Sequence, residues 1–233
     1  MDKGKGVFTK ALIFIGLIVL IVVANATPMF LIRFQGDLEG GVKWFLALAY
    51  TVIVAFLITW LWKWYQKGVD TDQAKQKISW KDVGIILLFY LAGRVIAVAG
   101  TVINQLVSGN QMSMNDQAIF GFTAGLKEGF LPFTICFLLV IGIVAPIIEE
   151  LVFRGLASQL LFSGGNKWLA AIVTSLIFGL LHATNPIEWI MYTGLGIVFY
   201  LAYARRRNIK DSILLHMINN ILPAILLAYT IFA

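Results

Sequence analysis

Three charged residues lie close together in the stretch VAPIIEELVFRG, residues 144–155, inside a long apolar run. An ionisable side chain at membrane depth costs at least about 2.5 kcal/mol, so it normally faces the protein interior and has a partner. Glu150 precedes Arg154 by four residues, the spacing and order that favour an ion pair on one helix. Glu149 points about 100° away from Glu150 on a helix, so Arg154 cannot easily pair with both acids. We expect a structural ion pair between Glu150 and Arg154, which leaves the carboxylate of Glu149 available for chemistry.

The two histidines of the chain lie in later apolar runs, and each has a partner four residues away. FGLLH holds Phe178 and His182, and HMINN holds His216 and Asn220. Residues at i and i+4 share a helix face, so each pair can point at one interior position. A carboxylate and an imidazole that share a water can take its proton, and an imidazole and an amide can stabilise an oxyanion. These residue types predict hydrolysis of an amide by an activated water at Glu149.

The residue types also bear on two other kinds of hydrolytic site, a zinc site and a serine or cysteine nucleophile. Two histidines and a glutamate also suit a catalytic zinc with an open position, so Glu149, His182 and His216 are candidate zinc ligands, although the H-E-x-x-H signature is absent. The chain has no G-x-S-x-G elbow for a serine nucleophile. Its single cysteine, Cys136, lies in an apolar run and is expected to be a core thiol.

The three stretches EELVFR, FGLLH and HMINN resemble, in the same order, the motifs E-E-x-x-x-R, F-x-x-x-H and H-x-x-x-N of the CAAX-protease and bacteriocin-processing family of intramembrane proteases. The resemblance covers about residues 130–232. It implies that Glu149 is the general base and His182 its partner in activating water. By the same resemblance, His216 and Asn220 hold the oxyanion, Glu150 and Arg154 fill the remaining motif positions, and Phe178 shapes the pocket.

The resemblance leaves the cofactor open, because members of this family have been described both as metal-dependent and as glutamate-type enzymes. We favour the metal-free mechanism, since Asn220 is a poor zinc ligand and a good oxyanion donor. No cofactor is therefore expected, and zinc is the alternative. The expected partners are a membrane-associated peptide or protein tail as substrate and the surrounding lipids.

Composition indicates what kind of protein holds these residues. Of 233 residues, 60% are hydrophobic and 13% charged, and the mean hydropathy is +0.86. A soluble domain is nearer half apolar and a quarter charged, so we expect an all-α, polytopic membrane bundle of about seven transmembrane helices. The predicted spans are residues 9–34, 42–64, 83–107, 130–162, 168–184, 187–204 and 212–232. Residues 129–233 would form the protease core, and residues 1–128 carry no motif of the family.

Basic residues predict the orientation of the bundle. Most of them follow or precede spans on one side, and the positive-inside rule then places the N-terminus in the cytoplasm, as expected of a multi-pass protein of a bacterial cytoplasmic membrane. Since these charges lie in short loops beside spans, nucleic acid is not an expected partner. The residues on the predicted inner side are Lys3, Lys5, Lys10, Lys63, Lys67, Lys75, Lys77, Lys81, Lys167, Arg205, Arg206, Arg207 and Lys210; those on the other side are Arg33, Lys43 and Lys127.

Several local features stay open at this level. Pro28 predicts a kink or an early end of the first span. The connection at residues 63–81 is expected to be a solvated loop rather than a surface helix, and residues 108–117 form a second polar connection. Arg94 either reaches the membrane surface or pairs with Asp116 or Glu128.

The depth of the two histidines in the membrane is a further question. A straight count places His216 about 8 Å and His182 about 20 Å from the cytoplasmic ends of their spans, so the helices must start at different heights or the boundaries must shift. A polar cavity open to the cytoplasmic half is expected at the site.

Two other functions fit the same residues. One is a non-catalytic scaffold or bacteriocin immunity protein, in which the polar residues join helices. The other is a proton-coupled transporter, in which Glu149 and the histidines relay protons. A second acid beside an already paired one argues against the scaffold, and the lack of an internal repeat argues against the transporter.

Overall fold

The computed structural model describes residues 6–109, 112–163 and 165–233, and within these ranges the chain is helical with no strand. The expectation of an all-α, polytopic membrane bundle is confirmed. Lys3 and Lys5, and residues 110 and 111 of the second polar connection, lie outside the described residues. The helices are α1 (Val7–Phe34), α2 (Gly40–Gln66), α3 (Thr71–Lys75), α4 (Trp80–Ser108), α5 (Met114–Phe120), α6 (Thr123–Lys127), α7 (Leu131–Leu139), α8 (Ala145–Glu150), α9 (Ala157–Leu160), α10 (Lys167–His182), α11 (Pro186–Arg206) and α12 (Ile209–Phe232).

Every predicted span corresponds to a helix, and the protein is a multi-pass integral membrane protein. Among the described residues, six helical stretches are long and apolar enough to cross a bilayer: Val7–Asp37, Gly40–Gln66, Trp80–Ser108, Leu131–Leu160, Pro186–Arg206 and Ile209–Phe232. The remaining predicted span is α10, a shorter apolar helix of 16 residues. At 1.5 Å per residue, α10 is about 24 Å long, less than the roughly 30 Å of a hydrocarbon core.

The fourth span is one continuous helical stretch interrupted by two π-helical segments. Val140–Val144 (η2) separates α7 from α8, and Leu151–Leu156 (η3) separates α8 from α9. A π segment shifts the helical register, leaves i→i+4 hydrogen bonds unmade and is frequent at functional sites. The six residues of α8, which end at Glu150, therefore lie between two register shifts.

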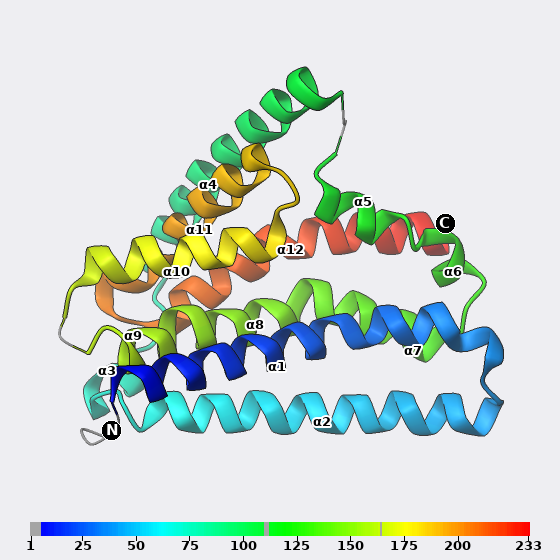
Figure 1. The fold of residues 1–233 in the computed structure, drawn as a ribbon, viewed down its shortest axis with the longest axis horizontal. Helices are drawn as coiled ribbons and strands as arrows, with labels where there is room; N and C mark the ends of the chain where they lie inside the picture. The colour runs from blue at the N-terminus through cyan, green and yellow to red at the C-terminus, as the bar shows by residue number, and fades with distance from the viewer. Residues whose placement is uncertain (1–5, 110–111, 164) are drawn as a thin grey trace.

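The packing brings the C-terminal helices onto α8 (Figure 1). The helices α1 and α2 run along the long axis of the molecule beside the stretch from α7 to α9, whereas α4 and α11 lean away from it together. The helix α12 packs against η2 and α8, and α11 packs against α4, α10 and α12. The first and third motifs therefore lie face to face, although they are far apart in sequence.

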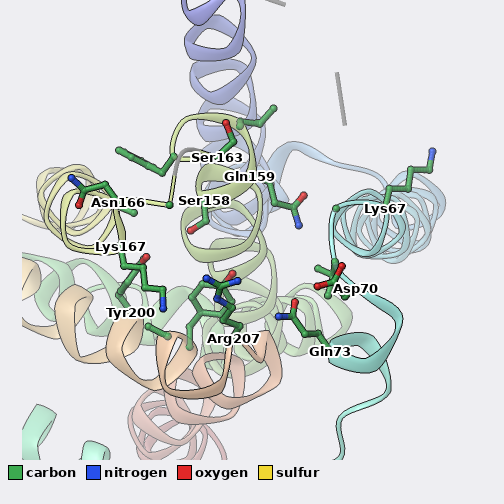
Figure 2. Close-up of a pocket in the computed structure, with 18 of the residues that line it drawn as sticks. Lys67, Asp70, Gln73, Ser158, Gln159, Ser163, Asn166, Lys167, Tyr200 and Arg207 are labelled. Carbon is green, nitrogen blue, oxygen red and sulfur yellow. The ribbon is translucent and has the colours of Figure 1, made fainter. Parts of the chain in front are cut away.

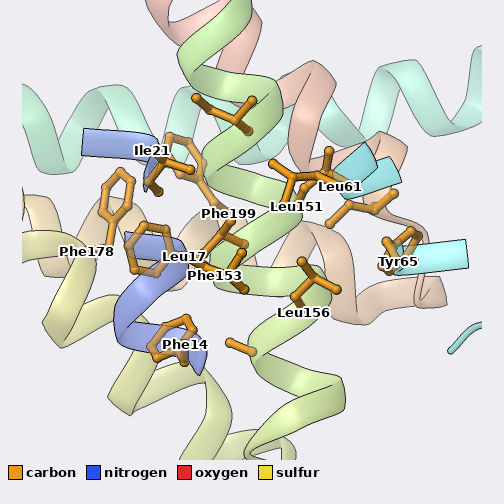
Figure 3. Close-up of a cluster of buried hydrophobic side chains, with 14 of the residues drawn as sticks. Phe14, Leu17, Ile21, Leu61, Tyr65, Leu151, Phe153, Leu156, Phe178 and Phe199 are labelled. Atoms are coloured by element: carbon orange, nitrogen blue, oxygen red, sulfur yellow. The ribbon is translucent and has the colours of Figure 1, made fainter. Parts of the chain in front are cut away.

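An apolar core surrounds this meeting point (Figure 3). Each of the helices α1, α2, α10 and α11 contributes side chains that pack on the residues following Glu150. Phe153 is central, because its ring makes edge contacts with Phe14 at 6.0 Å and with Phe178 at 5.7 Å. The core residues shown include Phe14, Leu17, Ile21, Leu61, Tyr65, Leu151, Phe153, Leu156, Phe178 and Phe199.

The structure tests the sequence predictions for Pro28, for the two polar connections and for Cys136. The helix α1 continues past Pro28 to Phe34, so an early end at that proline is wrong. The first polar connection contains the five-residue helix α3, and the second leads into α5 and α6, neither of which the apolar pattern predicts. Cys136 is buried in an apolar cluster as expected.

Candidate active site

The carboxylate of Glu149 is the point on which the three motif helices converge. Glu149 is 6% exposed. Its Oε2 lies 3.8 Å from Nε2 of His182 on α10 and 3.9 Å from Nε2 of His216 on α12. Its Oε1 accepts a hydrogen bond of 2.8 Å from Nδ2 of Asn25 on α1. Both oxygens therefore have polar neighbours, supplied by three other helices.

Glu150 forms a separate, fully buried group. Its Oε1 lies 3.2 Å from Nη1 of Arg154 and 3.0 Å from Nδ1 of His216. Arg154 also donates to the carbonyl oxygen of Gly196 at 2.9 Å, and its Cζ lies 4.8 Å from the centre of the Phe178 ring. The structure thus contains the pair expected from the four-residue spacing, and it adds His216 to it.

The partners of the histidines determine which ring nitrogen carries a proton. Nδ1 of His182 lies 2.8 Å from the carbonyl oxygen of Phe178, which can only accept. Nδ1 of His182 is therefore protonated, and in the neutral ring Nε2 directs a lone pair toward Glu149. A lone pair and a carboxylate oxygen 3.8 Å apart do not hydrogen bond directly, but a molecule that donates to both, such as water, would bridge them.

Aromatic rings hold the two imidazoles in place. His182 packs on Phe178 with ring centres 4.3 Å apart, and His216 stacks on Phe199 at 4.4 Å with an angle of 22°. Phe178 also contacts His216 edge-on at 5.8 Å. Phe178 therefore touches both histidines. Phe199 was not predicted, because nothing in the sequence distinguishes it from the other apolar residues of α11.

Asn220 lies one turn beyond His216 and contacts a different part of the chain. Its Nδ2 donates to the carbonyl oxygen of Ile141 at 3.2 Å, and its Oδ1 accepts from Nδ2 of Asn219 at 3.1 Å. Ile141 belongs to the π-helical segment η2. Among the described contacts, the structure does not bring Asn220 into hydrogen bonding with Glu149 or either histidine. Its second amide N–H is not used in these bonds.

Arg94 has a partner that the sequence did not suggest. Its Nη1 donates to Oδ1 of Asn219 at 3.2 Å, which connects α4 to α12. The resulting chain runs from Arg94 through Asn219 and Asn220 to the carbonyl of Ile141. Arginine can only donate and a carbonyl can only accept, so the two ends determine the orientation of both amides between them.

Asn25 is the other polar neighbour that sequence reasoning missed. A polar residue in the apolar run of α1 was the available signal, because an amide at membrane depth usually has a partner. Its Oδ1 is buried without a hydrogen-bond partner among the described residues. The contact with Glu149 joins residues 124 positions apart, which spacing alone cannot reveal.

The two histidines reach Glu149 from different heights. His182 is the last residue of α10, about 22 Å from its start, whereas His216 is about 10 Å into α12. The helix boundaries differ from the expected ones by only a few residues. The helices therefore start at different heights around the site, which is one of the two explanations that the straight count leaves open.

The sequence analysis also leaves zinc open as an alternative cofactor and predicts a polar cavity at the site. In the described part of the chain, no group of three or more His, Cys, Asp or Glu side chains has an arrangement that could hold a metal ion. A cavity of about 840 Å³ exists, but it is lined by other residues, at the helix ends near α3 and α9.

Comparison with known proteins relates this region to membrane proteases. Residues 131–222 match the family described as type II CAAX prenyl endopeptidase Rce1-like. The chain is 30% identical over 156 residues to the membrane-embedded CAAX protease MroQ of Staphylococcus aureus, and 29% identical over 143 residues to YdiL of Bacillus subtilis. It is 27% identical over 169 residues to the UPF0177 protein YxdF of Lactococcus lactis. The family resemblance suggested by the three motifs is confirmed over residues 131–222.

The extent of these matches differs between the proteins. The match to MroQ covers 64% of this chain and 58% of MroQ. The match to YdiL covers 59% of this chain and 55% of YdiL. The match to YxdF covers 71% of this chain and 85% of YxdF. The chain thus spans a little over half the length of the first two relatives. No solved structure matches it.

Proposed function

We propose that this chain, whose residues 131–222 match the Rce1-like family, is an intramembrane endopeptidase in which Glu149 and His182 activate a water molecule. The observation that carries the proposal is the 3.8 Å gap between Oε2 of Glu149 and Nε2 of His182. Both atoms accept hydrogen bonds, and a water bound between them would direct its own lone pairs outward toward a substrate carbonyl.

In the first step of the proposed reaction, Glu149 takes a proton from the water while the water oxygen attacks the carbonyl carbon of the peptide bond. The tetrahedral intermediate carries its negative charge on the former carbonyl oxygen. Glu149 then gives the proton to the leaving nitrogen as the C–N bond breaks. The products are an amine and a carboxylic acid that keeps the second proton of the water, and Glu149 is again ionised.

His216 and Asn220 are proposed to stabilise the oxyanion. Nδ1 of His216 lies 3.0 Å from Oε1 of Glu150, and an N–H on its other ring nitrogen, Nε2, would be one donor to the oxyanion. The second N–H of Asn220 is the other donor. A donor of this kind contributes about 10²–10³-fold to kcat in enzymes that use an oxyanion hole.

We further propose that the reaction needs no metal. The support for this is that the Asn220 amide suits an oxyanion better than it suits zinc. If zinc did bind, Glu149, His182 and His216 would hold it, and the ion would supply a Lewis acid. The substrate is proposed to be a peptide or protein tail at the membrane, since the site lies among apolar helices.

The test uses purified protein in proteoliposomes with lipid-anchored quenched fluorescent peptides. Glu149→Gln and His182→Ala are expected to lose at least about 10²-fold in kcat while they keep the wild-type melting temperature. The exposed Lys63→Gln serves as a matched control with wild-type activity.

Each assay is repeated after treatment with a strong chelator. Activity that survives chelation supports the metal-free reaction, whereas loss with rescue by zinc would move the same residues to metal ligation. Full activity in both variants would contradict the proposed site.

A further inference from the structure

A polar cavity lies at the end of the bundle that carries most of the basic residues (Figure 2). Its volume is about 840 Å³, within the roughly 300–1,000 Å³ of small-molecule sites. The ends of α1, α2, α9, α10 and α11 surround it together with the segment that leads into α3. None of the residues proposed for catalysis lines it, so it is a separate site.

Cations dominate the charge of this cavity. Lys10, Lys67, Lys167 and Arg207 line it, against one carboxylate, Asp70. No ion pair joins any of these four cations to an acid in the described part of the chain. Figure 2 shows Lys167 and Arg207 pointing toward the middle of the cavity and Lys67 pointing outward. Two cations that face one space without an anion repel each other, unless a ligand supplies the negative charge.

Arg207 differs from its two neighbours in the run RRR. Arg205 contacts Asp82 and Asp211 at 2.7 and 2.9 Å, and Arg206 contacts the same two acids at 3.2 and 2.7 Å. The fold therefore pairs two arginines with buried acids. It leaves the third at the cavity, where no acid meets it in the described structure.

Arg207 has a backbone conformation that is unusual for an arginine. Arg207 caps the C-terminal end of α11 with φ 53° and ψ 36°, a left-handed conformation that glycine or asparagine adopts at a lower energy. A non-glycine residue in this region is destabilised by about 1 kcal/mol or more. Glycine at this position would have a lower backbone energy. We therefore attribute the presence of an arginine to a role of its guanidinium in the cavity.

The other lining groups indicate the class of ligand. The phenol groups of Tyr200 and Tyr203 can donate hydrogen bonds, and Oε1 of Gln159 is a buried acceptor without a partner among the described residues. Trp64 and Ile13 add an apolar wall. The set fits a phosphate that also carries hydroxyl groups and is attached to an apolar chain.

We propose that this cavity binds the phosphate of an anionic phospholipid headgroup, with Arg207 and Lys167 as the charged ligands. The lipid is the favoured source of the phosphate because the cavity lies at the ends of membrane-spanning helices, where headgroups are at high local concentration. Arginine forms paired hydrogen bonds to phosphate oxygens, and lysine adds a point charge. The proposal does not depend on the protein being a protease.

The test measures binding of short-chain phosphatidylglycerol and phosphatidylcholine to the purified full-length protein in detergent. Arg207→Gln and Lys167→Gln are each expected to weaken binding of phosphatidylglycerol about fivefold, and the double variant about 30-fold. Binding of phosphatidylcholine should change little. The matched control is Lys63→Gln, which removes a charge from the same end of the bundle at a position that does not line the cavity.

A parallel titration with inorganic phosphate and glycerol phosphate separates the possible sources. Selective binding of phosphatidylglycerol that Arg207→Gln weakens supports the lipid site, and equal binding of the soluble phosphates supports a phosphate site filled from solution. Equal affinity for both lipids in wild type, or equal loss in the Lys63→Gln control, would show that the cations only contribute general surface charge and would overturn the proposal.

Discussion

At the level of single residues, the side chain of Asn25 has the most direct contact with the proposed base. Its amide donates to Oε1 of Glu149 and thereby leaves Oε2 facing the two histidines. Asn25 is a positioning residue in this arrangement, because it acts through Glu149 rather than on the substrate. It also lies outside the segment that matches the protease family.

We predict that Asn25→Ala lowers kcat about 10- to 100-fold with little change in KM, because the carboxylate loses the contact that orients it. The measurement is peptide cleavage by the purified variant. Thr27→Ala, which removes a polar group from the same helix, is the matched control and should keep wild-type kcat. An unchanged kcat in Asn25→Ala would remove Asn25 from the proposed mechanism.

The buried pair of Glu150 and Arg154 makes a different prediction, which concerns stability. Removing one partner of a buried ion pair leaves an uncompensated charge and typically costs about 3–5 kcal/mol. Arg154→Met should therefore lower the melting temperature strongly. The double variant Arg154→Met with Glu150→Gln should recover part of the loss. If the single variant melts like wild type, the pair does not stabilise the fold.

At the level of elements, close approach between α10 and α11 positions His182. A Cβ atom added at Gly196 would lie 2.9 Å from Cβ of Ser175 on α10, too close for the two helices to keep their spacing. A Cβ added at Gly84 on α4 would meet no atom within 4 Å. The two glycines therefore offer a matched pair of substitutions.

We predict that Gly196→Ala destabilises the protein by about 1–3 kcal/mol, because overpacking forces the helices apart. Gly84→Ala should be neutral or stabilising by up to about 1 kcal/mol, since alanine favours a helix over glycine. Chemical or thermal unfolding of the two purified variants compares them directly. Equal effects would mean that the spacing of α10 and α11 is not limited at Gly196.

The elements also show how far the sequence alone could lead. Apolar run lengths predicted every long helix, and the four-residue spacing of Glu150 and Arg154 anticipated their contact. Helical periodicity did not reveal the π segments on either side of α8, because they change register within one continuous apolar run. It also could not reveal the contacts of Asn25 with Glu149 and of Arg94 with Asn219, since these depend on how separate helices pack.

At the level of the whole molecule, the distribution of basic residues predicts how the bundle lies in the membrane. Lys63 is on the side rich in basic residues and Lys127 on the other, and Cys136, the single cysteine, is buried. We predict that a membrane-impermeant maleimide labels Lys127→Cys in intact cells and labels Lys63→Cys only after permeabilisation. The wild-type protein should give little background. Labelling of both variants in intact cells would contradict the predicted orientation.

The contact between Asn25 and Glu149 also bears on how the protein is made. A membrane protein is synthesised from its N-terminus, so α1 enters the bilayer long before α8, and α12 with His216 and Asn220 enters later still. Until α8 arrives, the amide of Asn25 has no carboxylate to bond. A chain synthesised only as far as α11 therefore lacks part of the proposed polar set and would be inactive in the proposed reaction.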